Sequence, residues 1–308
     1  MRSRAGTVNI AITGASGLIG RGLIKLLSSQ GHTVLVLSRH GGTNLPPNVR
    51  LAVWDPEKGE PSEGALRDTD AVIHLAGENV AQRWTPDAKR RIRESRELGT
   101  RNLVCALARL ARRPSVLVCA SAVGYYGSRG DDALTESSPP GAGFLSEVCA
   151  AWEREAVAAE ALGIRVVRVR TGVVLDARGG AFQRMLPPFR LGAGGKLGDG
   201  RQWMPWIHHQ DLAELFRWAA EKPIRGALNA VAPNPVTNAD FTRELARALH
   251  RPAILPVPKF ALRLMFGEMS EILLASQRVT PNAAIAAGFA FRFPRLGAAL
   301  ADLLKGGA

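Results

Sequence analysis

A glycine-rich turn near the start of the chain, set between an apolar run and an amphipathic stretch, most constrains the fold. The apolar run over 8–12 predicts a strand, the helical spacing of apolar residues over 18–27 predicts a helix, and 33–37 predicts a second strand. The turn itself reads TGASGLIG over 13–20, a GxxGxxG pattern. Because this order of elements is a βαβ unit, the chain is expected to build a parallel sheet.

The same alternation of strands and helices continues along the chain. Short β-branched runs predict strands over 50–54, 71–75, 115–121 and 165–170, and longer segments predict helices over 86–112 and 144–162. After residue 171 the pattern loosens into Gly/Pro-rich loops, and after 233 it becomes short helical segments separated by prolines. The sequence therefore predicts an α/β fold, a Rossmann-like doubly wound parallel sheet over 1–231, with a smaller, mostly helical C-terminal lobe over 232–308. A loop insertion at about 176–205 is expected to contribute to the substrate lobe.

The three glycines of the turn have the spacing of a phosphate-binding loop. Gly14 would allow the tight turn, Gly17 would let backbone N–H groups approach a pyrophosphate, and Gly20 would let the helix pack closely on the sheet. The phosphates would then lie at the positive N-terminus of the helix. The predicted cofactor-binding loop consists of Gly14, Ser16, Gly17, Leu18, Ile19 and Gly20. A glycine turn without a ligand is the alternative interpretation.

The end of the second predicted strand indicates which nucleotide this loop binds. Sites that prefer NAD carry an acidic residue there, about 20 residues after the glycines, and the segment Leu37-Ser38-Arg39-His40 has none. The Arg39 guanidinium can donate two charge-assisted hydrogen bonds to a 2′-phosphate, and its planar face can stack on adenine. The sequence therefore favours NADP(H) over NAD. The alternative is that Arg39 is one more surface arginine.

The basic charge of the chain comes almost entirely from dispersed arginines. Of the 40 basic residues 33 are arginines, and the formal net charge is +13. Their one dense run, over 89–96, lies on a predicted helix without interleaved aromatic residues. A solvated or domain-facing helix is therefore expected rather than a nucleic-acid surface.

Composition and cysteine usage exclude several other classes of protein. The apolar runs are too short to span a membrane, and the N-terminus lacks the apolar core of a signal peptide, so no membrane contact is expected. Cys105, Cys119 and Cys149 are an odd number without metal-binding spacing, which predicts buried free thiols, a cytoplasmic location and no metal site. The sequence does not indicate an oligomeric state.

Eight segments, the glycine-rich turn among them, resemble one family, the extended short-chain dehydrogenase/reductase superfamily, and within it the "epimerase family protein" branch, sometimes labelled cell-division-inhibitor-like. The segments are TGASGLIG at Thr13, HLAGENV at His74, SRELGTRNLV at Ser95, SAVGYYG at Ser121, FLSEVCAAWE at Phe144, RTGVVL at Arg170, GDGRQWMPWIHHQDL at Gly198 and APNPVTNADF at Ala232. Residues 256–303 resemble the C-terminal domain of unknown function of that branch through GEMSEILLASQRV and GFAFRFP. The resemblance implies a Rossmann-like NADP-binding fold and leaves the substrate open.

The resemblance also implies roles for individual residues. Asp55, after the third predicted strand, matches the acidic residue that meets the adenine amino group, and Leu75, Ala76 and Gly77 match the strand end beside the cofactor ribose. Ser121 matches the catalytic serine that hydrogen-bonds the substrate oxygen.

The tyrosine and lysine that the superfamily uses for proton transfer are missing. Alignment of the helix by Glu153 puts Leu145 and Cys149 where the tyrosine and lysine should be, and no lysine occurs between Lys89 and Lys196. Two substitutes for proton transfer are expected. Tyr125 follows the serine strand as a tyrosine does in many relatives, and Glu147 lies on the helix near the missing pair, although an exposed helical glutamate is an equal alternative.

Four other residues are candidates for substrate contacts. Arg96 stands where many relatives have an asparagine, which indicates altered chemistry or an anionic ligand. Trp203, Trp206 and His208 lie in one loop that leads to a helix, where the tryptophans could wall a pocket, although the pair His208-His209 has a structural alternative. Asp211 is expected to cap that helix.

Two functions follow from these residues. The first is an NADP-dependent reductase or epimerase-like enzyme acting on a carbonyl or hydroxyl group of an unknown small molecule. The second is an NADP(H)-binding regulatory protein that has lost catalysis.

Overall fold

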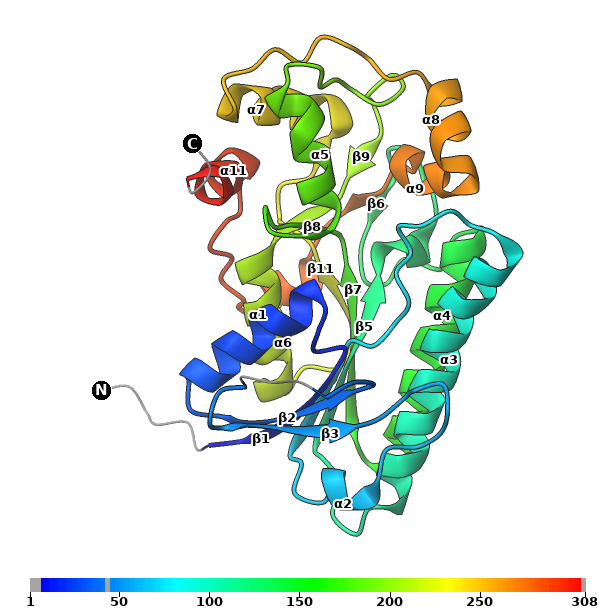
Figure 1. The fold of residues 1–308 in the computed structure, drawn as a ribbon, viewed down its shortest axis with the longest axis vertical. Coiled ribbons are helices and arrows are strands. Elements are labelled where there is room, and N and C mark those ends of the chain that lie inside the picture. Colours follow the sequence, from blue (N-terminus) through cyan, green and yellow to red (C-terminus); the bar gives the residue numbers. More distant parts are fainter. Residues whose placement is uncertain (1–6, 42–44, 306–308) are drawn as a thin grey trace.

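A seven-stranded sheet forms the centre of the molecule in the computed structural model, which describes residues 7–41 and 45–305 (Figure 1). The strand order is β11-β7-β5-β4-β1-β2-β3, and every neighbouring pair runs parallel. The order reverses between β1 and β4, which is the switch point where doubly wound sheets bind ligands. The predicted fold class is confirmed.

The bounds of the elements follow the sequence patterns closely in the first half of the chain. The strands are β1 Asn9–Thr13, β2 Thr33–Ser38, β3 Val49–Val53, β4 Ala71–His74, β5 Val116–Ala122, β6 Ala133–Leu134, β7 Arg165–Thr171, β8 Val173–Leu175, β9 Trp203–Met204, β10 Trp206–His208, β11 Gly226–Ala230, β12 Val236–Thr237 and β13 Arg278–Val279. The helices are α1 Leu18–Ser29, α2 Glu63–Leu66, α3 Pro86–Arg109, α4 Phe144–Val157, α5 Gly180–Arg190, α6 His209–Glu221, α7 Asn238–Ala248, α8 Lys259–Phe266, α9 Ser270–Leu274, α10 Asn282–Ala286 and α11 Leu296–Leu304, with 3-10 turns η1 Val123–Tyr126, η2 Ala158–Leu162 and η3 Gly267–Met269.

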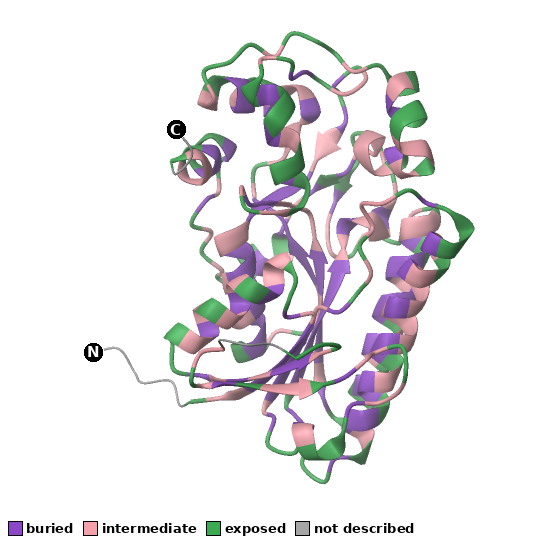
Figure 2. Cartoon of the chain, viewed as in Figure 1, coloured by how far each residue is buried: buried purple, intermediate pink, exposed green. Residues whose placement is uncertain are grey.

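Helices cover both faces of the sheet. α3 packs beside α4 on one face, and α1 packs beside α6 on the other. Of the strands between them, β4 and most of β5 are buried along their length, as Figure 2 shows. α3 begins where Thr85 accepts a hydrogen bond from the N–H of Ala88 and Pro86 takes the first helical position, which are local signals for a helix start.

The C-terminal part of the chain lies beyond the carboxyl ends of the central strands. Its short strands pair with earlier segments: β13 pairs with β6, and β12 pairs with β9. α7 packs on α11, and both belong to a second apolar cluster around α5 that is separate from the core of the large sheet. In the described residues, no helix is both long and apolar enough to cross a membrane.

Three sequence predictions need correction. The edge strand β11 was not predicted, because its sequence GALNA has little β-propensity. The segment 176–205, expected as loop, contains the helix α5, even though Pro187 and Pro188 lie inside it. Cys119 and Cys149 are buried as expected, but Cys105 is exposed.

Candidate functional site

A hydrogen-bond network at the switch point holds the glycine-rich loop against the end of β4. The Thr13 Oγ1 atom accepts the N–H groups of Leu75, at 3.0 Å, and Ala76, at 3.1 Å, and lies 2.7 Å from Nδ1 of His74. Burial lowers the pKa of His74 to about 3, so the ring is neutral. Because Thr13 already accepts two N–H groups, its own proton goes to Nδ1, and the Nε2–H of His74 donates to Oγ1 of Thr100 at 3.0 Å.

The glycines of this loop have little space around them. Gly14 has φ +65°, and a Cβ atom there would lie 2.7 Å from the backbone of Leu75. At Gly20 a Cβ atom would lie 2.6 Å from the backbone of Ala15, so both positions require glycine in the fold itself. Gly17 differs, because a Cβ atom there would meet only the carbonyl oxygen of Gly14, at 3.2 Å.

The N-terminus of α1 is free to receive an anion. Gly17 is the N-cap and supplies no side-chain acceptor, and the first turn contains no acidic residue. The N–H groups of this turn therefore lack side-chain partners at the positive end of the helix dipole. These features fit a phosphate group.

Two of the predicted cofactor residues lie at the ends of neighbouring strands. Arg39 directly follows β2, and its side chain is exposed. Asp55 lies two residues after β3, is half-buried, accepts the N–H of Glu57 at 3.2 Å and lies 3.4 Å from Nζ of Lys58. Since β2 and β3 are adjacent, both side chains belong to the same edge region of the sheet as the glycine loop.

A buried ionic network lies under the end of β5. The Ser121 hydroxyl donates to the Glu153 carboxylate at 2.8 Å, and the Arg170 guanidinium makes a two-pronged contact with the same carboxylate at 2.8 and 2.9 Å. Arg170 also donates to the Tyr126 hydroxyl at 3.0 Å. Hydrogen bonds and charge attraction from Glu153 raise the pKa of Arg170 despite its burial, so this arginine stays charged.

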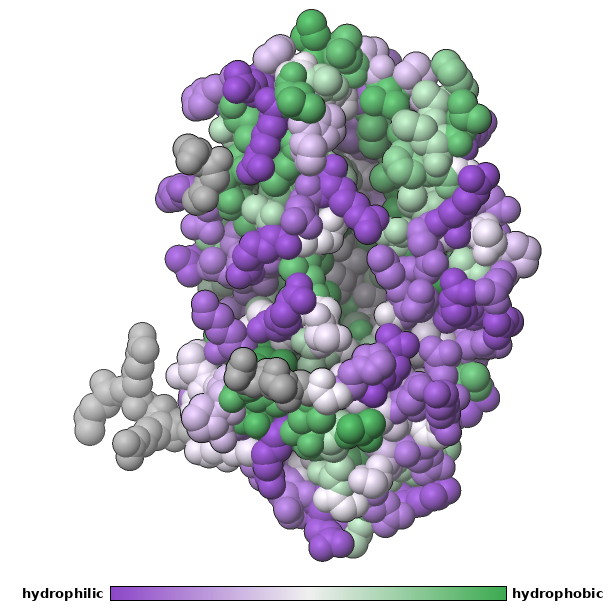
Figure 3. Space-filling model, viewed as in Figure 1, coloured by the Kyte–Doolittle hydropathy of each residue, from purple (hydrophilic) through white to green (hydrophobic). Residues whose placement is uncertain are grey.

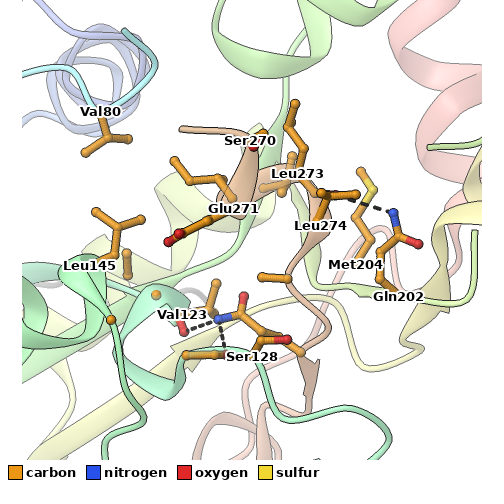
Figure 4. Close-up of a pocket in the computed structure, with 18 of the residues that line it drawn as sticks. Val80, Val123, Ser128, Leu145, Gln202, Met204, Ser270, Glu271, Leu273 and Leu274 are labelled. Carbon is orange, nitrogen blue, oxygen red and sulfur yellow. Dashed lines mark hydrogen bonds between the residues drawn. The ribbon is translucent and has the colours of Figure 1, made fainter. Parts of the chain in front are cut away.

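A cavity of about 860 Å³ opens beyond the carboxyl ends of β5 and β7. Its walls come from η1, the start of α4, the β7–β8 connection, α5, β9 and the C-terminal segment 263–277. Most of its lining is apolar, including Val80, Trp84, Val123, Phe144, Leu145, Met185, Met204, Ile272, Leu273 and Leu274. Figure 4 shows Val80, Val123, Leu145 and Leu274 around this space.

One end of α5 connects the glycine loop with the cavity. At Gly179 and Gly180, added Cβ atoms would lie 3.0 and 3.1 Å from the side chain of Leu18, the first residue of α1. The next residue, Ala181, lines the cavity. The start of α5, residues 179–181, therefore lies against the glycine loop at Leu18 and also lines the cavity.

Two glutamates, Glu268 and Glu271, belong to the lining, and the exposed side chain of Glu271 points toward this space from α9 (Figure 4). Its carboxylate makes no ion pair or hydrogen bond within the described part of the chain, whereas the neighbouring Glu268 is paired with Lys89 of α3. Glu271 is not identifiable from the sequence, because nothing in GEMSEILL indicates which glutamate faces a cavity. Arg263 of α8 is the one basic residue of the described lining.

Gln277 fastens the C-terminal segment to η1. Its side-chain amide donates to the carbonyl oxygens of Val123, at 2.8 Å, and Gly127, at 2.9 Å, and the side chain lines the cavity. On the other wall, Gln202 donates to the carbonyl oxygen of Leu273 at 3.3 Å, which Figure 4 marks with a dashed line. Two glutamines thus fix the position of α9 and its carboxylate.

The three predicted catalytic residues do not line the cavity. Ser121 is turned to Glu153, and the next residue, Ala122, lines the cavity instead, because successive side chains of a strand point to opposite faces. Tyr125 stacks under the Arg170 guanidinium, with the guanidinium carbon 3.5 Å from the ring centre. Glu147 is 65% exposed and pairs with Arg93 at 3.1 Å, so its position gives no support to a role in proton transfer.

The predicted substrate residues divide between the cavity and the core. Trp203 lines the cavity, and its indole N–H donates to Asp131 at 2.7 Å. Trp206 is fully buried in the second apolar cluster. His208 is also fully buried, and it is the N-cap of α6, where its Nδ1 atom accepts the N–H of Gln210 at 3.2 Å. The position of the cap corrects the prediction for Asp211, which accepts the N–H groups of Arg292 and Phe293 instead.

Arg96 lies beside the predicted cofactor strand end rather than in the cavity. Its guanidinium donates to the carbonyl oxygens of Glu78 and Ile92, both at 3.0 Å, and stacks on Trp152. A Cβ atom at Gly77 would lie 3.1 Å from that guanidinium, so Arg96 and the strand end are in direct contact. Arg96 gives no support to an anionic substrate in the cavity.

Comparisons with known proteins agree with this arrangement. The family model described as "NAD dependent epimerase/dehydratase family" matches residues 10–231, and a domain of unknown function, DUF1731, matches residues 257–303. The epimerase family protein YfhF of Bacillus subtilis is 40% identical over 96% of this chain and 98% of its own length. A Mycobacterium bovis epimerase family protein is 43% identical over 94% of this chain and 96% of its own.

A solved structure is similar over nearly the whole chain. The crystal structure of human epimerase family protein SDR39U1 (isoform 2) with NADPH superimposes with a TM-score of 0.85, at 36% identity, and covers 96% of this chain and 99% of that one. The sheet order, the glycine loop and these matches lead to one conclusion. The chain belongs to the NAD dependent epimerase/dehydratase family, in its extended short-chain dehydrogenase/reductase form with a C-terminal DUF1731 domain.

Proposed function

We propose that this chain is an NADP(H)-dependent oxidoreductase or epimerase-like enzyme that acts on a hydroxyl or carbonyl group of a small molecule held in the cavity. The observation that carries the proposal is the wall shared by the phosphate loop and the cavity at Leu18, Gly180 and Ala181. In this proposal residues 1–231 bind the nucleotide, and residues 232–308 complete the substrate side.

The residues present fit a dinucleotide. The left-handed Gly14 turn, the open approach at Gly17 and the uncapped N-terminus of α1 suit a pyrophosphate, and the exposed Arg39 would meet a 2′-phosphate. The human relative SDR39U1 was crystallised with NADPH. When bound, NADP(H) supplies hydride transfer to or from a carbon atom of the substrate.

The chain itself supplies orientation, a dry cavity and a group that handles the proton. The apolar walls limit the access of water to the reacting carbon, and the side-chain oxygen of Gln277, whose amide N–H groups are bonded to Val123 and Gly127, is a polar group of the lining. In the oxidising direction the Glu271 carboxylate would accept the hydroxyl proton of a substrate whose carbinol carbon would give up a hydride, and bound NADP⁺ would supply the hydride acceptor. Glu271 takes the role that the sequence predicted for Glu147, because Glu147 is paired with Arg93 outside the cavity and Glu268, the other glutamate of the described lining, is paired with Lys89.

The experiment is a screen of hydroxyl and carbonyl compounds for cofactor reduction or oxidation at 340 nm. Turnover should appear with NADP(H) in the wild type and in Glu147→Gln, and should fall at least about 100-fold in Glu271→Gln, the size of a general-base contribution. Formate should partly restore Glu271→Ala, because a small carboxylate can occupy the vacated space. Full activity in Glu271→Gln would exclude Glu271 as the base.

A regulatory protein that binds NADP(H) without turnover is the second candidate. It is favoured by the lining of the described cavity, which contains neither tyrosine nor lysine, and by the commitment of the Ser121 hydroxyl to Glu153. Saturable NADPH binding together with no turnover across the whole screen would decide for this alternative.

A further inference from the structure

Large apolar side chains gather on the exposed surface at one end of the molecule. Of the eight large hydrophobic residues that are exposed in the described chain, six lie on the end of α5, on the loop before α8 and on α8 itself. We call these six residues the α8 surface: Leu191, Ile254, Leu255, Phe260, Leu264 and Met265. Figure 3 shows these apolar atoms at the top of the molecule, and Figure 2 shows that α8 is largely exposed.

The two loops that carry this surface are held together rather than loosely extended. Leu197 pairs with Val257 in a β-bridge, and the N–H of Gly198 donates to the carbonyl oxygen of Val257 at 2.8 Å. A Cβ atom at Gly195 would lie only 1.7 Å from the carbonyl oxygen of Leu255, so the backbones are in direct contact. A fixed, exposed apolar patch of this kind indicates a surface that binds another protein or a membrane when the protein is at work.

The charged side chains on α8 and on the loop before it are positive, whereas two exposed glutamates, Glu268 and Glu271, follow on η3 and α9. From 249 to 266 the chain carries Arg251, Lys259 and Arg263 and no acidic residue, and Arg190 and Lys196 lie on the neighbouring segment. The one carboxylate on these two segments, Asp199, is paired with Lys259 at 3.2 Å. Exposed apolar side chains flanked by arginine and lysine are the composition that binds anionic lipid headgroups while inserting into the acyl boundary.

We propose that the α8 surface docks on an anionic lipid bilayer. Phe260 and Leu264, which are 73% and 82% exposed and lie one helical turn apart, would insert, while Arg251 and Lys196 meet lipid phosphates. Arg263 of the same helix lines the cavity, so the proposed docking helix is also part of the cavity wall. This inference revises the expectation of no membrane contact, which considered only segments long enough to span a bilayer.

The experiment is flotation of the full chain with vesicles of phosphatidylcholine alone and with vesicles that contain one quarter phosphatidylglycerol. The wild type should float with the anionic vesicles, and 0.5 M NaCl should weaken this binding at least fivefold. The double variant Phe260→Ser/Leu264→Ser should bind at least tenfold more weakly. Val53→Ser/Ile285→Ser is the matched control, because it removes exposed apolar residues outside the α8 surface and should bind like the wild type.

Several outcomes would overturn the proposal. One is the absence of flotation with anionic vesicles, and another is equal flotation of the double variant and the wild type. A third is self-association in analytical ultracentrifugation that Phe260→Ser/Leu264→Ser abolishes without any vesicle binding, which would assign the surface to a second copy of the chain. NADPH titration of the same proteins separates this test from that of the proposed function, since the α8 variants leave the glycine loop unchanged.

Discussion

The Ser121 hydroxyl and the Glu153 carboxylate form a buried hydrogen bond of 2.8 Å between the end of β5 and α4. Glu153 also accepts two hydrogen bonds from Arg170 and one from the Arg168 guanidinium, at 3.2 Å, so two arginines share this one carboxylate as a counter-charge. The contact joins two strands and a helix at the floor of the site.

Replacement of this carboxylate should strongly destabilise the fold. Glu153→Gln leaves Arg170 buried without a counter-charge, and breaking a buried pair costs about 3 to 5 kcal/mol in the free energy of unfolding. Urea denaturation measures the loss. Glu147→Gln, on the same helix but exposed, is the control and should change the free energy by less than about 0.5 kcal/mol. Similar values for the two variants would show that the network contributes little.

Gly17→Val should separate cofactor binding from folding. A side chain there meets only the Gly14 carbonyl oxygen at 3.2 Å in the protein but would occupy the approach of the pyrophosphate. NADPH titration should show no binding, while the urea midpoint stays near that of the wild type. Gly14→Ala is the contrasting variant, since its Cβ atom would lie 2.7 Å from the backbone of Leu75 and should lower the midpoint. Normal NADPH affinity in Gly17→Val would contradict this assignment of the loop.

Arg39 should determine the preference for NADPH over NADH. A charge-assisted contact with the 2′-phosphate contributes roughly 1.5 to 3 kcal/mol, which corresponds to about tenfold or more in Kd. Titration of both cofactors into the wild type and Arg39→Ala measures it. The preference should disappear in the variant, with NADH affinity almost unchanged. Equal affinities for the two cofactors in the wild type would refute the prediction.

Two buried histidines should make the protein less stable in mild acid. Burial lowers the pKa of His74 to about 3 and that of His208 to about 4, so both stay neutral in the folded protein while the unfolded chain binds protons below about pH 6.5. The unfolded state is therefore favoured as the pH falls from 6.5 to 5.5, by up to about 1.4 kcal/mol per histidine and pH unit.

His208→Asn tests this linkage. Asparagine keeps an N-cap acceptor for α6 and removes one titrating group. The slope of the unfolding free energy against pH should therefore decrease by the contribution of one histidine. Urea unfolding at pH 6.5, 6.0 and 5.5 gives both slopes. An unchanged slope in the variant would mean that His208 is protonated in the folded protein.

The fold was largely predictable because the strands near the switch point are continuous apolar runs that alternate with helices. β4 and β5 follow their predicted segments within one or two residues. The helix α5 was not predictable from the sequence, because local propensity argues against Pro187 and Pro188 in a helix. The burial of Phe182, Leu186 and Phe189 nevertheless favours the helix. Tertiary packing overrode the local signal there.

The site was less predictable because it depends on which way each side chain points. A one-residue step along β5 places Ala122 rather than Ser121 at the cavity, and two tryptophans three residues apart divide between the cavity and the core. Glu271 is brought to the site by pairing of β13 with β6, a contact between residues more than 140 positions apart in the chain. No local pattern in the sequence records such a contact.

The hydrogen bonds from Gln277 to Val123 and Gly127 join a late segment of the chain to an early one, so they can form only near the end of synthesis. On the ribosome the glycine loop and most of the large sheet are complete long before residue 277 is added, so the nascent chain can fold its nucleotide-binding half first. The C-terminal wall of the cavity, residues 263–277, is added only afterwards. A chain that terminates before residue 263 therefore has the glycine loop and lacks this wall of the cavity.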